Sequence, residues 1–174
     1  ASSNGWDHTV LTYSQGRATF YLNGSSVYSA LETPDYTNAQ GTFIGTSASL
    51  ASSAFFKGSL DEARIYNRAL SADEVAGLYR QSVETKLDVS QDTRLTNGLV
   101  GLWSFDGPDV SGTTAYDMSG SGNNGTLRNG SIVAVGKIGQ ALSLDGGTQD
   151  VDLPTLPSLV APYSVSVWMK PTVL

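Results

Sequence analysis

Cysteine is absent from this chain of 174 residues. Its absence excludes a disulfide scaffold, thiolate zinc sites and cysteine nucleophiles. The sequence also lacks any apolar run near the roughly 18 residues that a membrane helix needs, so we expect no membrane insertion. Positive charge is scarce, with 10 Lys and Arg against 16 Asp and Glu. A net charge of −6 without a basic cluster repels a phosphate backbone, so we expect no nucleic-acid partner.

What the chain does contain favours one soluble domain that is rich in strands. Its length fits one domain or at most two, at about 150 residues each, and 40% hydrophobic residues are enough for a core. Charged residues make up only 15%, below the roughly 25% of an average domain. The chain also has 19 glycines and 6 prolines, which form turns. Low charge with many turn formers predicts an all-β protein.

Short segments rich in β-branched and aromatic residues predict the strands. They lie at 9–13, 18–22, 42–45, 60–66, 99–105, 142–144 and 163–169. The dipeptide Asn23-Gly24 has the positive φ preference of a two-residue hairpin turn, so a meander follows the second of these strands.

The sequence predicts one helix, over residues 72–79. Ser71 can cap it, and Glu74 three residues later completes a capping box. Leu70 and Val75 are placed to form a hydrophobic staple around this start. Residues 81–97 lack aromatics and strand alternation, and we interpret them as a linker between segments 1–80 and 98–174.

Two blocks of sequence resemble a known family. The string GSLDEARIYNRALSADEV at 58–75 is similar to the closing strand and helix of the laminin-G-like branch of the concanavalin A-like lectin/glucanase superfamily. WDHTV at 6–10 and FYLNG at 20–24 resemble the strand pair before it. The family's opening half is similar to GLWSFDG at 101–107, DMSG at 117–120, NNGTL at 123–127, GKIGQAL at 136–142 and VSVWMKP at 165–171. The resemblance implies a concanavalin A-like jelly-roll β-sandwich with one short helix after the closing strand.

The two blocks stand in reverse order, and the strands that the family usually places between them are not evident. Residues 1–80 correspond to the second half of a laminin-G-like sandwich and residues 98–174 to the first half. A circular permutation, a tandem array cut out of register and strand exchange between chains are three explanations. Unpaired edges of a half sandwich are an aggregation hazard, so we favour pairing that involves a neighbouring copy.

The resemblance implies a structural calcium where the first and last strands meet. The residues that match are Asp61, Asp106 and Asp117. Calcium prefers six to eight oxygen ligands from carboxylates and carbonyls, which loops of this composition supply. The alternative is that Asp106 and Asp117 are turn aspartates bonded to their own backbone.

No catalytic arrangement stands out. Asp61 and Glu62 invite a glycosidase interpretation, but successive strand residues point to opposite faces and cannot flank one glycosidic bond. Glu62 and Arg64 are expected to pair instead. His8 is the single histidine, and Asp7 beside it on a strand points away, so no catalytic triad is expected. We therefore expect no enzyme activity.

The function that follows is a non-catalytic extracellular module that binds carbohydrate or mediates adhesion, secreted or on the cell surface. Its expected partner is a glycan or another surface protein. The alternative is a structural repeat or filament subunit that assembles with copies of itself by strand exchange. Sugar binding needs exposed rings. The candidates are Trp6, Tyr13, Tyr28, Trp103 and Trp168.

Overall fold

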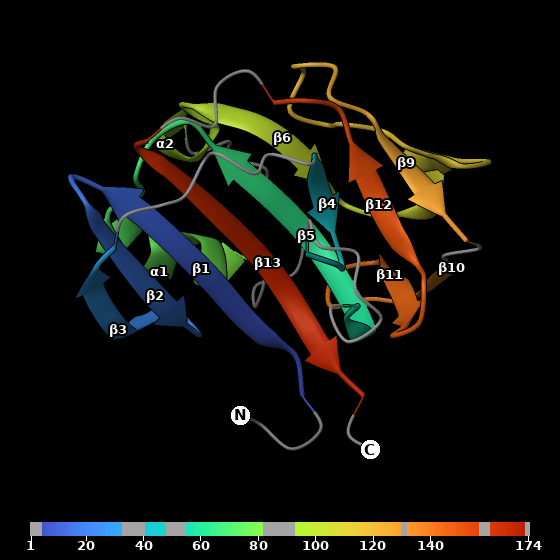
Figure 1. The fold of residues 1–174 in the computed structure, drawn as a ribbon, viewed down its shortest axis with the longest axis horizontal. Helices are drawn as coiled ribbons and strands as arrows, with labels where there is room; N and C mark the ends of the chain where they lie inside the picture. Colours follow the sequence, from blue (N-terminus) through green and yellow to red (C-terminus); the bar gives the residue numbers. More distant parts are fainter. Residues whose placement is uncertain are drawn as a thin grey trace.

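The computed structural model describes residues 5–32, 41–47, 55–81, 93–129, 132–156 and 161–172. Its strands form two antiparallel sheets, one of eight strands and one of five, which pack on each other (Figure 1). This arrangement confirms the predicted all-β sandwich of concanavalin A-like type. None of the helices in the described ranges is long and apolar enough to cross a membrane.

The large sheet has the order β10–β11–β5–β13–β1–β2–β3, with β6 as a further strand beside β5. Its strands are β1 (Asp7–Ser14), β2 (Arg17–Leu22), β3 (Ser25–Leu31), β5 (Lys57–Tyr66), β6 (Leu99–Trp103), β10 (Ile132–Val135), β11 (Gln140–Asp145) and β13 (Tyr163–Pro171). The small sheet has the order β4–β12–β9–β8–β7. Its strands are β4 (Thr42–Ile44), β7 (Val110–Ser111), β8 (Thr114–Ala115), β9 (Gly125–Arg128) and β12 (Asp150–Leu153).

The two segments of the chain meet along β5. One edge of β5 pairs with β13, placing Ile65 opposite Val165, and its other edge pairs with β6 and β11 in succession. β13 in turn pairs with β1, placing Thr9 opposite Val167. Each of these pairs joins residues before the predicted linker to residues after it. The preference for pairing with a neighbouring copy is therefore wrong for this structure, because the two segments complete one sandwich within a single chain.

The linker prediction needs a second correction at its end. Residues 82–92 lie outside the described part, but α2 (Thr93–Thr96) is a short helix. Its Leu95 is buried in the cluster beneath α1 (Ala72–Gln81). The last residues of the predicted linker therefore belong to the folded domain.

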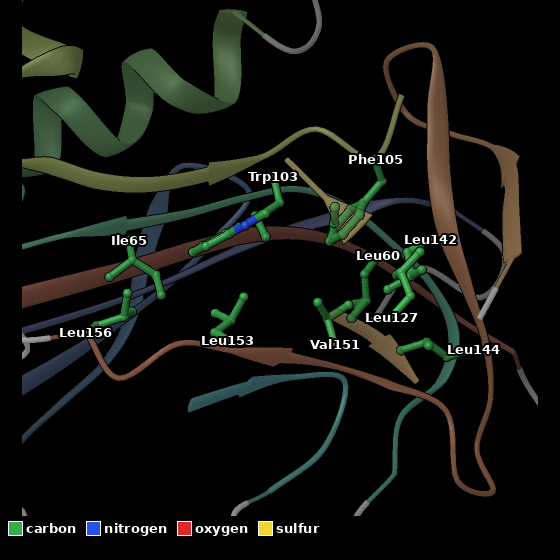
Figure 2. Close-up of a cluster of buried hydrophobic side chains, with 12 residues drawn as sticks. Leu60, Ile65, Trp103, Phe105, Leu127, Leu142, Leu144, Val151, Leu153 and Leu156 are labelled. Atoms are coloured by element: carbon green, nitrogen blue, oxygen red, sulfur yellow. The ribbon is translucent and has the colours of Figure 1, made fainter. Parts of the chain in front are cut away.

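The core between the sheets is apolar and continuous. Figure 2 shows its side chains pointing from both sheets into the space between them. The buried members include Leu60, Ile65, Trp103, Phe105, Leu127, Leu142, Leu144, Val151, Leu153 and Leu156. Burying one such side chain stabilises the fold by roughly 1.5–3 kcal/mol. No residue of β1, β2 or β3 belongs to this cluster as described, so that end of the large sheet extends beyond the sandwich core.

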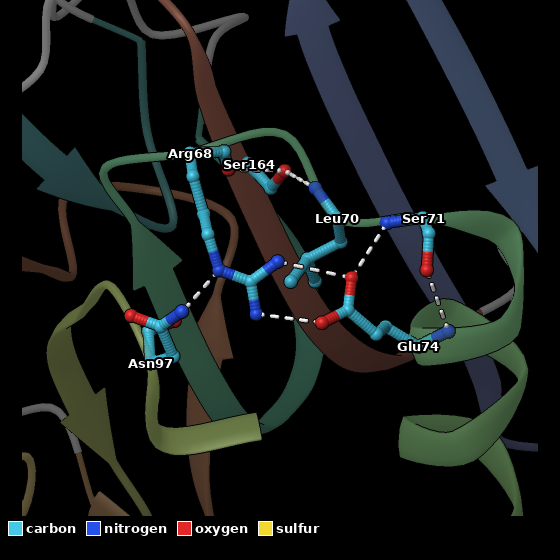
Figure 3. A network of polar contacts seen from close by, with 6 residues as sticks. All are labelled: Arg68, Leu70, Ser71, Glu74, Asn97 and Ser164. Carbon is cyan, nitrogen blue, oxygen red and sulfur yellow. Dashed lines mark hydrogen bonds and ion pairs between the residues drawn. The ribbon is translucent and has the colours of Figure 1, made fainter. Parts of the chain in front are cut away.

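The helix α1 covers the other face of the large sheet and begins as predicted. Glu74 accepts a hydrogen bond from the Ser71 amide, and the Ser71 hydroxyl accepts one from the Glu74 amide, which confirms the capping box (Figure 3). Leu70 and Val75 are both buried in the cluster under the helix. The sequence did not reveal that Arg68 holds both carboxylate oxygens of Glu74, at 2.9 and 2.7 Å. This pair ties the end of β5 to the first helical turn.

Candidate functional site

The five aromatic residues proposed for sugar binding differ in how far their side chains are exposed. Trp103 and Trp168 are fully buried, and Tyr13 is buried as well. Trp6 is half-buried. Tyr28 on β3 is 62% exposed. Among these candidates, Tyr28 therefore has the open ring face that a sugar needs.

A second exposed ring lies beside Tyr28. Phe20 on β2 is 41% exposed and stands directly opposite Tyr28 in the β2–β3 ladder. Directly opposite residues project from the same face of a sheet, with Cβ atoms about 4.5–5.5 Å apart. We call Phe20 and Tyr28 the ring pair.

The ring pair depends on a bulge that the sequence did not reveal. From the turn at Asn23-Gly24 the ladder starts with Leu22 opposite Ser25 and Tyr21 opposite Ser26. Simple continuation would place Val27 opposite Phe20. The register shifts at this point, so that Tyr28 takes the place instead. A β-bulge of this kind re-aims side chains without any change in the flanking pattern.

The two faces of the β2–β3 hairpin differ in chemistry. The ring pair continues inward to Leu11 on β1, which stands opposite Phe20 and is half-buried. The opposite face carries polar groups beside the exposed Leu31, which stands opposite Arg17: the Thr19 and Ser29 hydroxyls share a hydrogen bond of 3.0 Å, and Arg17 donates to Ser29 at 3.3 Å. The hairpin therefore presents an uncharged apolar strip on the face that carries the rings.

The three aspartates proposed for calcium do not all meet at one place. Asp61 Oδ2 accepts the amides of Lys137 and Ile138 at 2.8 and 2.9 Å, and Asp106 Oδ1 accepts the amide of Gln140 at 2.7 Å. Both thus hold the loop 136–140. Gly139 has a φ of +65°, and a Cβ there would lie 2.1 Å from Asp106 Oδ1, so this close approach requires glycine.

Asp117 closes a different loop. Its Oδ1 accepts the amides of Leu102 and Ser119, and its Oδ2 accepts the amide of Asn123. Although burial pushes the pKa of Asp117 upward, these hydrogen bonds together hold it below its ordinary value. Asp117 therefore acts as the turn aspartate of the alternative interpretation.

The fit to a cation rests on Asp61. Its side chain is fully buried, and its Oδ1 has no hydrogen-bond partner in the described part of the chain. Burial raises the pKa of this carboxyl to about 7; the charge of Glu62 adds to the rise, while the amides of Ile138 and Lys137 oppose it. No group of three His, Cys, Asp or Glu side chains in the described ranges is arranged to hold a metal ion. Calcium at Asp61 and Asp106 thus stays a prediction, in which backbone carbonyls would supply the other ligands.

The strand alternation that was expected to put Asp61 and Glu62 on opposite faces does not hold at this point of β5. Glu62 has a φ of +52°, and the pairing of β5 with β13 shifts register beside it, so the alternation of faces is interrupted there. Both carboxylates are nevertheless buried. Glu62 accepts a hydrogen bond of 2.5 Å from Arg64, which confirms the expected pair. In this structure Asp61 holds the loop 136–140, and Glu62 is paired with Arg64.

His8 is a packed core residue. Its ring lies 5.0 Å from the ring of Trp168 and 6.1 Å from that of Tyr79. Its Nε2 and the Ser166 hydroxyl share a hydrogen bond of 2.9 Å. Burial, helped by the positive charge of Arg64, lowers the pKa of His8 to about 4. The neighbouring Asp7 accepts a hydrogen bond from the Asn23 side chain.

An apolar cavity of about 230 Å³ lies between β4 and the large sheet. Its walls include Ile44, Phe56, Trp103, Val167 and Met169. This lining offers few partners for sugar hydroxyls, so the cavity does not fit a carbohydrate.

Comparison with known proteins agrees with this architecture. Residues 1–76 match the family model of the concanavalin A-like lectin/glucanases superfamily of laminin-G-like type. The resemblance noted from the sequence is therefore confirmed for this segment. Neither the curated proteins nor the solved structures gave a significant match.

Proposed function

From the laminin-G-like identity of residues 1–76, we propose that the chain is a non-catalytic module that binds neutral carbohydrate on the face of its β2–β3 hairpin. The observation that supports this most is the ring pair. Phe20 and Tyr28 are exposed, adjacent and on one face of the large sheet. Superfamily membership by itself supports only a lectin-like or adhesion-type module, because one fold hosts many functions.

The chemistry of the ring pair suits a sugar. The C–H face of a pyranose is apolar and stacks on an aromatic ring, and two neighbouring rings fix its position on the surface. The Tyr28 hydroxyl adds a donor and an acceptor at the edge of the platform. A preformed platform on a sheet loses little side-chain entropy on binding.

The charge of the chain favours neutral glycans over acidic ones. The segment of β3 from Ser25 to Leu31 carries no charged residue, and the whole chain has a net charge of −6. Sulfated or sialylated glycans would meet repulsion from this net charge. We therefore propose neutral glycans as ligands, displayed to a secreted or surface-exposed protein.

A non-catalytic role is proposed because the adjacent carboxylates are committed elsewhere. Asp61 is buried against the loop 136–140, and Glu62 is paired with Arg64. The ring pair itself carries no acid or base.

A glycan array with neutral and acidic glycans, read at several calcium concentrations, tests the proposal. The wild-type chain should bind neutral glycans saturably, and Phe20→Ala and Tyr28→Ala should each weaken binding roughly tenfold, the scale of one lost stacking contact. Tyr116→Ala is the matched control, because Tyr116 is also 41% exposed but lies outside the hairpin. Saturable binding that survives Phe20→Ala, or that Tyr116→Ala removes equally, would contradict the assignment. Silence of the array would remove the carbohydrate role.

A further inference from the structure

The apolar cavity between β4 and the large sheet has no part in the proposed glycan site. Its volume is about 230 Å³, it is partly open to solvent, and its lining includes Phe43, Phe56, Trp103, Val167 and Met169. Protein interiors are packed about as densely as organic crystals, and they contain few voids larger than a water molecule. A space of this size is therefore large enough to hold a small organic molecule.

Hydrogen bonds hold the walls of this cavity in place. The strand β4 is paired with β12, and the carbonyl of Gly45 at its end accepts the Phe56 amide at 2.7 Å. On the opposite wall, the ring nitrogen of Trp103 donates to the carbonyl of Asn123 at 3.1 Å. Closing the space would disturb these bonds. An apolar occupant would instead restore the dispersion contacts that the empty side of each wall lacks.

The lining has no uncommitted polar side chain that could bind a charged group. Every residue of the lining is described, and only Arg64 and Ser166 have polar groups besides the Trp103 ring nitrogen. Arg64 donates to Glu62, and the Ser166 hydroxyl shares a hydrogen bond with Nε2 of His8. An ionised group buried here without a partner would lose far more in desolvation than its apolar part would gain. The occupant that fits is therefore neutral.

The kinds of side chain in the lining and the size of the space favour a flat aromatic ligand. Phe43, Phe56 and Trp103 supply three rings, and Met169 supplies a thioether. Ring–ring and sulfur–ring contacts add to the gain from apolar burial, and an alkyl chain does not make them. A cavity of about 150 Å³ with a similar lining binds benzene, so this cavity has room for a larger ring system. We propose that it binds a neutral aromatic molecule of two fused rings.

The two methionines of the chain allow a direct test with naphthalene as the probe. Met169 lines the cavity, whereas Met118 lies outside the lining and is 51% exposed. In spectra of methyl-labelled methionine, naphthalene should shift the Met169 signal saturably through its ring current and leave the Met118 signal in place. It should also raise the melting temperature, because only the folded state has the cavity. An unchanged Met169 signal up to the solubility limit of naphthalene would overturn the proposal.

A filling variant and a matched control locate the bound probe. Val167→Phe places a ring in the existing space and should raise the dissociation constant of naphthalene at least about tenfold. Val167→Leu fills less of the space, retains the fold with less repacking, and should weaken binding by a smaller factor. Val135→Phe adds the same ring at a position that is 86% exposed on β10, and it should leave binding unchanged. Equal binding by the variants at 167 and at 135 would contradict the assignment to the cavity.

Two further probes test the chemical class of the ligand. 2-Naphthoate has the same rings with a carboxylate and should bind at least about tenfold more weakly than naphthalene. n-Octanol, a flexible chain, should also bind more weakly, and either probe binding as tightly as naphthalene would refute a neutral aromatic ligand. The cavity lining and the ring pair have no residue in common, so Phe20→Ala should bind naphthalene as the wild type does. Loss of naphthalene binding in Phe20→Ala would exclude the cavity, whereas a silent glycan array would leave it standing.

Discussion

The middle of the large sheet and its β2–β3 end have opposite environments. β5 is flanked by strands on both edges and contributes to a buried cluster on each face, with Ile65 toward the sandwich core and Tyr66 toward the helix. β3 pairs on one edge in the described structure, and most of its side chains are exposed. The middle strands hold the two segments of the chain together, and the end strands carry the ring pair of the proposed glycan site.

Polar groups also differ between the middle of the large sheet and its β2–β3 end. In the middle, Asp61, His8 and Ser166 are fully buried and their pKa values or hydrogen bonds are shaped by burial. At the end, Thr19 and Ser29 are bonded at the surface. Changes in the middle should therefore alter stability, whereas changes at the end should alter binding.

The largest contrast is expected between two aromatic truncations. Trp103→Ala should lower the free energy of unfolding by about 3–5 kcal/mol, because the fully buried ring fills the core between the sheets. Phe20→Ala should change it by less than about 0.5 kcal/mol, because the ring is exposed. Denaturant unfolding of both variants measures the difference. Comparable losses in the two variants would break the distinction between middle and end.

Calcium binding is expected to stabilise the middle of the large sheet and not its β2–β3 end. If an ion binds Asp61 and Asp106 in the folded state alone, calcium at about a hundred times its dissociation constant should add roughly 2.7 kcal/mol to the free energy of unfolding. Chelator should lower the melting temperature of the wild type, and Asp61→Asn should remove the shift. Asp117→Asn is the control that should keep the calcium response, because Asp117 closes a separate loop. Identical melting with and without chelator in a metal-loaded sample would exclude the site.

The pH dependence of stability should contain two opposing contributions from the middle of the sheet. Asp61 has a folded pKa of about 7, above its ordinary 3.8, so the folded state binds more protons between these values and stability falls as pH rises. His8 has a folded pKa of about 4, below its ordinary 6.5, so the unfolded state binds more protons there and stability rises with pH. Each slope is at most about 1.4 kcal/mol per pH unit.

Two variants separate these contributions. Between about pH 4.5 and 6.5, Asp61→Asn should become more stable as pH rises, and His8→Gln should become less stable. The wild type should vary less than either, because its two slopes oppose each other. Urea unfolding at a series of pH values provides the measurement. Parallel profiles for the wild type and Asp61→Asn would refute the assignment to Asp61.

A smaller effect is expected at the start of the helix. Ser71→Ala removes the hydroxyl that accepts the Glu74 amide and should cost about 1 kcal/mol. Ser71→Asp should retain most of the stability, because a carboxylate also caps a helix. Thermal melting of both variants checks this, and an unchanged melting temperature in Ser71→Ala would show that the cap contributes nothing beyond the Arg68–Glu74 pair.

The sequence predicted those elements whose signals are local. β1, β5, β13 and α1 have long strand or helix patterns with capping residues, and the structure places them as expected within a few residues. β7 and β8 have 2 residues each, and β9, β10 and β12 have 4 each, which is too short for an alternation pattern to show. The partner of each segment also depends on contacts far apart in the chain, such as that between β5 and β6.

The candidate site was predictable only in part. Tyr28 was among the proposed rings, but its pairing with Phe20 depends on the bulge at Val27, which leaves no mark in the residue types. The same holds for Glu62, whose positive φ breaks the alternation assumed from the sequence. Trp103 and Trp168 are buried, whereas Tyr28 is exposed. Burial follows from packing between segments, which a single sequence does not display.

Residues on the two sides of the linker complete one sandwich within a single chain. Ser59 on β5 stands directly opposite Ser143 on β11, and both side chains are half-buried, so Ser59→Cys with Ser143→Cys should form a disulfide. At high dilution, we predict a cross-linked monomer of 18.3 kDa that migrates faster without reductant. Covalent dimers or larger chains joined through these two cysteines would contradict the account.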